Sequence, residues 1–144
     1  VYDKNLLSTF SHVAKNLDME HVLVVHGDDG LDEISVTSET SISELKDMQI
    51  KEYKISPTDF GLDFGTFEAI TAQSSEESLK MVNEAFAGTK SSIQDMIALN
   101  AGAALYIADK VISINDGVEL AFDLMNSGKA AEKLNAYVNA SNNL

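Results

Sequence analysis

The sequence lacks cysteine, tryptophan and arginine, and it holds a single proline, Pro57. Without cysteine it can form no disulfide scaffold, thiol nucleophile or Cys-ligated zinc site, and we expect a reducing, intracellular setting. No apolar run approaches the ~20 residues that span a bilayer. The chain starts at Val1 without the basic start or the long apolar stretch of a signal peptide. We therefore expect a cytoplasmic protein.

Positive charge is also scarce. Ten lysines face 23 acidic residues, which gives a formal net charge of −13 at pH 7. Neutralising nucleic-acid phosphates needs clustered Lys and Arg, and an anionic membrane surface attracts basic segments. We expect neither nucleic acid nor a membrane as a partner. The length of 144 residues predicts one domain, and the hydrophobic fraction of 44% is ordinary for a globular protein.

The first half of the chain predicts a helix followed by strands. Apolar residues recur at helical spacing over 3–17, with Asp3 as the candidate N-cap. The continuous aliphatic run 22–25 is typical of a buried strand, covered on both faces, in a mostly parallel sheet. Alternation over 34–55 predicts a small antiparallel meander with turns near 38–40 and 46–48. The stretch 56–73 is expected to be a loop, pinned by Phe60, Leu62, Phe64 and Phe67.

The second half predicts helices with clear N-terminal signals. Ser74 with Glu77 resembles a capping box. Ser92 with Asp95 and Ser113 with Asp116 are expected to open two further helices, and Ser127 to start the last one. The expected helices cover 74–86, 92–109, 113–126 and 127–138. The fold class is therefore α/β: a buried, mostly parallel strand and small antiparallel strands, packed with about five helices.

Four carboxylates, Asp28, Asp29, Asp32 and Glu33, crowd the loop that follows the first strand. Open α/β sheets keep their ligands at this end of a strand. Like charges at such density need a counter-ion, and hard oxygen ligands select Mg²⁺ or Ca²⁺. The spacing does not match an EF-hand, and a solvated acidic loop is the alternative interpretation.

Two further polar residues allow two interpretations each. His26, at the end of the first strand, is either structural or a ligand or base. Asn100 opens the small-residue stretch 100–104, which either packs closely or faces a ligand. No catalytic residue and no residue binding an organic cofactor is assigned.

The acidic loop carries a family resemblance. Residues 24–33, VVHGDDGLDE, resemble the acidic signature of anthranilate phosphoribosyltransferases. The resemblance continues in order through 52–53 and 57–62, then through 100–106, and then through Gly117 and Ser127-Gly128. It thus covers nearly the whole chain.

The resemblance implies a phosphoribosyltransferase, a glycosyltransferase of tryptophan biosynthesis. Such an enzyme transfers the phosphoribosyl group of phosphoribosyl pyrophosphate to anthranilate, giving N-(5′-phosphoribosyl)anthranilate and pyrophosphate. In the family the adjacent Asp-Glu pair of the signature binds the Mg²⁺ that accompanies pyrophosphate. The matching positions here are Asp32 and Glu33. The resemblance also implies that the longer parent protein is a homodimer.

The resemblance reaches only the C-terminal part of the family's protein. We therefore expect residues 1–144 to be a single C-terminal fragment of an α/β domain of the nucleoside phosphorylase and phosphoribosyltransferase type. The N-terminal helical domain and the glycine-rich phosphate loop have no counterpart here, so the fragment alone should be inactive. The alternatives are a piece of a pyrimidine nucleoside phosphorylase-like enzyme and a non-catalytic relative that binds nucleic acid.

Overall fold

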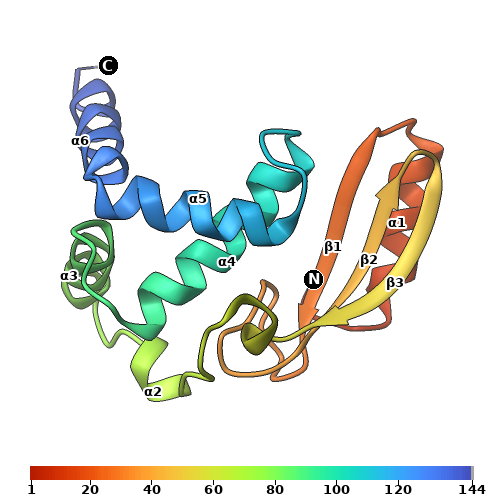
Figure 1. Cartoon of the computed structure of the whole chain (residues 1–144), viewed down its shortest axis with the longest axis horizontal. Helices are drawn as coiled ribbons and strands as arrows, with labels where there is room; N and C mark the ends of the chain where they lie inside the picture. Colours follow the sequence, from red (N-terminus) through yellow and green to blue (C-terminus); the bar gives the residue numbers. More distant parts are fainter. Residues whose placement is uncertain (144) are drawn as a thin grey trace.

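The computed structural model describes residues 1–143. Helix α1 (Leu6–Asn16) is followed by strands β1 (His21–Gly27), β2 (Thr40–Lys46) and β3 (Gln49–Ile55). A 3-10 turn, η1 (Pro57–Phe60), leads to the helices α2 (Phe67–Ile70), α3 (Ser75–Phe86), α4 (Ser92–Ile107), α5 (Ile114–Asn126) and α6 (Lys129–Ser141). Figure 1 shows the sheet and α1 at one end, α4 and α5 in the middle, and α3 and α6 at the other end.

The three strands form one antiparallel sheet in the order β1-β2-β3. The α/β class is confirmed, but the mostly parallel environment expected for β1 is not found within residues 1–143. β1 pairs antiparallel with β2 over its whole length, from His21 opposite Lys46 to Gly27 opposite Thr40. The physical reason is the loop 28–39, which turns the chain back beside β1 instead of crossing over a helix.

The expected strand at 34–37 is wrong, and so is the turn near 38–40. Ile34 and Val36 alternate with polar residues and are buried, yet residues 34–39 form no strand. Their backbone groups bind elsewhere: the Val36 carbonyl accepts from Gly65, and the Ser35 N–H donates to the Thr40 hydroxyl. The turn at 46–48 is confirmed, because Asp47 and Met48 both have positive φ, as a tight hairpin turn requires.

Serine side chains cap the N-termini of three helices, α3, α4 and α5. Ser74, Ser91 and Ser113 accept hydrogen bonds from the N–H groups of the third residue beyond each. The cap of α4 is therefore Ser91 and not Ser92. α1 begins after Asn5 and not at Asp3, and α6 begins after Gly128 and not at Ser127.

The stretch expected to be a loop contains η1 and the one-turn helix α2. Phe60 and Leu62 pack against the main core as expected. Phe64 and Phe67 do not pin the segment, because their exposed fractions are 51% and 45%.

The main core lies between the loop after β1 and the helices α4 and α5. Its buried members are Ile34, Val36, Ala98, Leu99, Ala103, Val118, Ala121 and Met125. α4 and α5 cross at Gly102 and Gly117, where a Cβ on Gly102 would lie 2.5 Å from the Val118 nitrogen. This close crossing fixes the position of α4, whose Asn100 side chain contacts the loop after β1.

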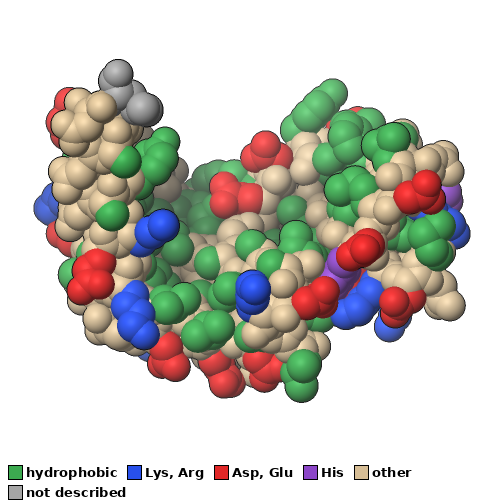
Figure 2. All heavy atoms as spheres, turned by 90° about the horizontal axis from the view of Figure 1, so that it is seen from above, with side chains coloured by type: hydrophobic (Ala, Val, Ile, Leu, Met, Phe, Trp, Pro, Cys, Tyr) green, Lys and Arg blue, Asp and Glu red, His purple; other side chains and the backbone are tan. Residues whose placement is uncertain are grey.

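An apolar cavity of about 380 Å³ lies between α3, α4, α5 and α6, lined by residues such as Phe86, Leu105 and Leu124. Hydrophobic side chains also gather in the hollow beside α6 in Figure 2.

Within residues 1–143, no helix combines the length and the apolar character needed to cross a membrane.

Candidate functional site: a carboxylate pair on the loop after β1

The loop after β1 is closed by its own backbone. The Gly27 N–H donates to the Leu31 carbonyl at 2.8 Å, and the Asp28 N–H donates to the Glu39 carbonyl at 2.9 Å. Gly30 has a φ of 98°, a conformation that L side chains rarely adopt. The four acidic residues therefore lie on a folded turn whose backbone conformation is fixed.

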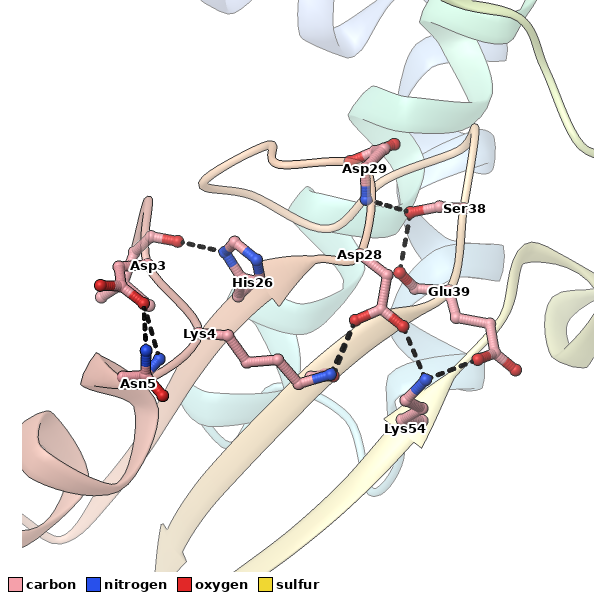
Figure 3. A network of polar contacts seen from close by, with 11 residues as sticks. Asp3, Lys4, Asn5, His26, Asp28, Asp29, Ser38, Glu39 and Lys54 are labelled. Atoms are coloured by element: carbon pink, nitrogen blue, oxygen red, sulfur yellow. Dashed lines mark hydrogen bonds and ion pairs between the residues drawn. The ribbon is translucent and has the colours of Figure 1, made fainter.

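Asp28 forms ion pairs with two lysines from other parts of the chain. Its carboxylate lies 3.0 Å from Lys4 Nζ, before α1, and 2.6 Å from Lys54 Nζ on β3. Lys54 also contacts Glu39 at 2.8 Å, so the group forms a chain of alternating charges (Figure 3). The hydrogen bonds from Lys54 and Lys4 lower the pKa of Asp28 to about 2. Asp28 is thus committed to ion pairs within the protein.

Asp29 is held by uncharged donors from within the loop. Its carboxylate accepts hydrogen bonds from the hydroxyls of Ser35 and Thr37 and, at 3.1 Å, from the Leu31 N–H. Burial alone would raise the pKa of Asp29, but these hydrogen bonds outweigh burial and lower it. Its own N–H donates to the Ser38 hydroxyl (Figure 3). Asp29 therefore organises the loop and does not project from it.

Asp32 and Glu33 differ from the first two acids. Both are exposed, and neither carboxylate accepts a hydrogen bond or forms an ion pair with any residue in the described part of the chain. Partial desolvation raises the pKa of Glu33, and the charge of Asp32 raises it further. The Val1 ammonium lies 3.4 Å from the backbone carbonyl oxygen of Asp32, but no cation within residues 1–143 forms an ion pair with either carboxylate. The loop thus presents two adjacent hard oxygen donors.

The two carboxylates of Asp32 and Glu33 fit Mg²⁺ better than a metal ion whose ligands all come from the protein. Across residues 1–143, no group of three or more His, Asp and Glu side chains is placed to hold a metal ion. Mg²⁺ needs only one or two carboxylates, because it keeps several waters and shares substrate phosphates. Zinc or Ca²⁺ sites built from protein alone take more ligands than this pair supplies.

Asn100, on α4, binds the backbone directly after this pair. Its side-chain oxygen accepts from the Ile34 N–H at 2.9 Å, and its side-chain nitrogen donates to the Ile34 carbonyl at 2.9 Å. Neither interpretation of the small-residue stretch anticipated this contact, since its partner lies 66 residues away. His26 has a structural contact, with its Nδ1 2.9 Å from the Val1 carbonyl oxygen.

A second polar cluster lies at the opposite end of the sheet. The Glu44 carboxylate on β2 contacts His21 Nε2 and accepts from the Tyr53 and Tyr106 hydroxyls, all at 2.9 Å. Tyr106 ties the end of α4 to the sheet through this carboxylate, and Lys46 lies 4.5 Å from the centre of its ring. No pattern in the sequence pointed to this cluster, because its members come from four elements.

Comparison with known proteins identifies the family of this chain. The family model described as "Glycosyl transferase family, a/b domain" matches residues 1–131. An anthranilate phosphoribosyltransferase of Vesicomyosocius okutanii is 41% identical over 141 residues, which are 98% of this chain and 42% of that protein. One from Leptothrix cholodnii is 44% identical over 138 residues, covering 96% of this chain and 40% of that protein. The chain therefore spans about two fifths of the length of these curated relatives.

Solved structures show the same fold. The anthranilate phosphoribosyltransferase from Thermus thermophilus superposes with a TM-score of 0.86 at 31% identity, over 96% of this chain and 40% of that one. The enzyme from Saccharomyces cerevisiae, solved in complex with PRPP and Mg, gives a TM-score of 0.87 at 21% identity. It covers all of this chain and 42% of its own, and at this identity the likeness shows the fold alone. With the family model matched over residues 1–131, the chain belongs to the glycosyl transferase family, as part of its a/b domain.

Proposed function

We propose that this chain is the metal-binding part of an anthranilate phosphoribosyltransferase, and that Asp32 and Glu33 hold its Mg²⁺. The longer protein would transfer the phosphoribosyl group of phosphoribosyl pyrophosphate to anthranilate and release pyrophosphate. The names of the relatives that are 40–44% identical support the reaction. The resemblance of residues 24–33 to the family's acidic signature supports the two ligands.

One observation carries the metal assignment. Of the four loop carboxylates, Asp28 and Asp29 have protein partners, whereas Asp32 and Glu33 have none within residues 1–143. Two neighbouring carboxylates left without a counter-ion are costly unless a cation joins them. The pair that is left free coincides with the pair that the family resemblance assigns to Mg²⁺.

Mg²⁺ would supply the positive charge that stabilises pyrophosphate as it leaves. This chain's own contribution is to hold two carboxylate ligands on a closed turn and to bind its nearby lysines to another carboxylate. Lys4 and Lys54 are bound to Asp28, so they do not neutralise the pair. Because the net charge of the chain is −13, a bound cation is also what lets this surface accept an anionic substrate.

The remaining parts of the site belong to the rest of the longer protein in this proposal. Since the chain spans about two fifths of its relatives, we propose that residues 1–144 alone do not catalyse the transfer. Turnover by the purified 144-residue chain would contradict this. The resemblance supports a homodimeric parent, and we place its reaction in the cytoplasm.

The test is the Mg²⁺ dependence of phosphoribosyl transfer by the longer protein, with Asp32→Asn and Glu33→Gln combined. We expect kcat/KM to fall at least ~100-fold, in the range of mutations that remove groups acting directly on transition-state charge. The matched control is Asp18→Asn with Glu20→Gln, which removes the same two charges at exposed positions between α1 and β1. Unchanged activity and Mg²⁺ dependence in the first variant would refute the assignment.

A further inference from the structure

We propose that Asn100 is a positioning residue for the carboxylate pair: its amide clamps the backbone of Ile34 and so sets where Asp32 and Glu33 present their oxygens. This inference rests on the proposed function, because it concerns the same metal site. It is carried by the contacts between α4 and the acidic loop.

The clamp has two points on one residue. The Asn100 side chain accepts from the Ile34 N–H and donates to the Ile34 carbonyl, both at 2.9 Å. The Ile34 N–H belongs to the peptide that joins Glu33 to Ile34, so this bond fixes the peptide plane on the C-terminal side of Glu33. Rotation of that plane would redirect the Glu33 side chain.

No strand ladder could replace the clamp. Residues 34–39 form no strand, and Ile34 is only 2% exposed, so water cannot satisfy its N–H and carbonyl in place of Asn100. A buried backbone pair without partners is unfavourable, and the segment would shift to find others. Any such shift begins one residue from Glu33.

The clamp is itself held rigidly. The same Asn100 side-chain nitrogen donates to the Met96 carbonyl at 3.0 Å within α4, which fixes the orientation of the amide. α4 is locked against α5 at Gly102, two residues further on, where a Cβ would lie 2.5 Å from the Val118 nitrogen. The clamp therefore connects the acidic loop to the most closely packed part of the core.

Asp29 holds the loop from the other side. Its carboxylate binds the Ser35 hydroxyl directly after Ile34, so the backbone on the C-terminal side of the carboxylate pair is fixed by two independent contacts. Asp29 acts within the loop, whereas Asn100 connects this point to a helix. We therefore expect Asn100→Ala to loosen the carboxylate pair while most of the turn remains closed.

The experiment measures Mn²⁺ binding to the longer protein, with pyrophosphate present and anthranilate absent. Site-specific broadening of backbone amide NMR signals locates the ion, and electron paramagnetic resonance of free Mn²⁺ gives the affinity. Asn100→Ala should weaken Mn²⁺ binding about tenfold, the lower end of what loss of an outer contact costs a metal site. The control is Asn83→Ala, an exposed position within α3 that tests the same exchange in a helix.

Asn100→Ser is the second variant, in case alanine impairs folding. Its hydroxyl can still bond to the Met96 carbonyl within the helix but is too short to bind Ile34. The same loss of affinity, with the folded population unchanged by circular dichroism and the Ile34 amide newly exposed to hydrogen exchange, supports the clamp. A variant that melts earlier but binds Mn²⁺ as the wild type does would show that Asn100 is merely structural, and the inference would be overturned.

The two levels of the proposal fail differently. If the wild-type protein shows no broadening at Asp32 and Glu33 with pyrophosphate present, the metal assignment fails, and the inference about Asn100 fails with it. If the wild type binds there and both Asn100 variants bind equally well, the metal assignment stands and only the inference about Asn100 is wrong.

Discussion

Replacing Gly117 with alanine tests the packing on which the site rests. Gly117 and Gly102 are buried where α5 crosses α4. A Cβ at Gly117 would overlap the Gly102 carbonyl oxygen and lie 2.8 Å from the carbonyl carbon. Both atoms are backbone, so no side chain can rotate away, and the two helices must separate.

Two opposing effects set the magnitude. Alanine is favoured over glycine inside a helix by about 1 kcal/mol. Overpacking a core costs roughly 1–3 kcal/mol, and a clash with backbone belongs at about 3 kcal/mol. The net prediction is a loss of about 2 kcal/mol. For a chain of this size, this lowers Tm by roughly 6 °C.

The assay is urea unfolding followed by circular dichroism. Ala104→Ser is the control, because it adds one heavy atom at an exposed position of α4 and should change stability by less than about 0.5 kcal/mol. Gly102→Ala opens the same crossing, so the double variant should cost at least ~0.5 kcal/mol less than the sum of the two single variants. A Gly117→Ala chain as stable as the wild type would refute the close crossing.

Three further predictions concern polar groups and the loop. The pKa of Asp28 is lowered from 3.8 to about 2, so its ion pairs stabilise the fold above about pH 4 and lose that contribution as the pH falls toward 2. The stability difference between wild type and Asp28→Asn, below ~1 kcal/mol because the lysines are half-exposed, should shrink over this range in melts at successive pH values. Glu44→Ala leaves His21, Tyr53 and Tyr106 without their acceptor and should cost about 3 kcal/mol in urea unfolding, whereas Tyr53→Phe should cost about 1 kcal/mol. Gly30→Ala should cost ~1 kcal/mol for its backbone conformation alone, since no atom lies within 4 Å of the new Cβ; an unchanged Tm would contradict the positive φ.

Local signals in the sequence predicted most of the helices. Ser74 and Ser113 indicate the starts of α3 and α5, because a cap acts within one turn of the chain. The direction of the strand pairing was not predictable in the same way. It depends on how the loop 28–39 turns, and hydrophobic composition alone does not distinguish a buried strand with parallel neighbours from one with antiparallel neighbours.

The failure at residues 34–37 has a specific cause. Ile34 and Val36 alternate as in a strand because both side chains enter the core. Their backbone partners, however, are Asn100 and Gly65, from distant parts of the chain. Alternate side chains are thus buried here although the backbone forms no hydrogen-bond ladder with a neighbouring strand.

The candidate site was predicted as a group of four acids but not in its internal division. Asp28 differs from the other three acids because it forms ion pairs with Lys4 and Lys54. The sequence does not show which distant carboxylate a lysine will contact. The choice of Asp32 and Glu33 came from family resemblance. Their lack of protein partners in the described chain is independent support for that choice, because it follows from the fold alone.

The most direct measurement is the anomalous scattering of Mn²⁺ in crystals of the longer protein grown with pyrophosphate. The proposal predicts a peak between Asp32 and Glu33, with at least one carboxylate oxygen of the pair at roughly 2.1 Å and pyrophosphate oxygens completing the coordination. A well-occupied pyrophosphate whose Mn²⁺ is held by other residues, with both carboxylates still facing water, would contradict it.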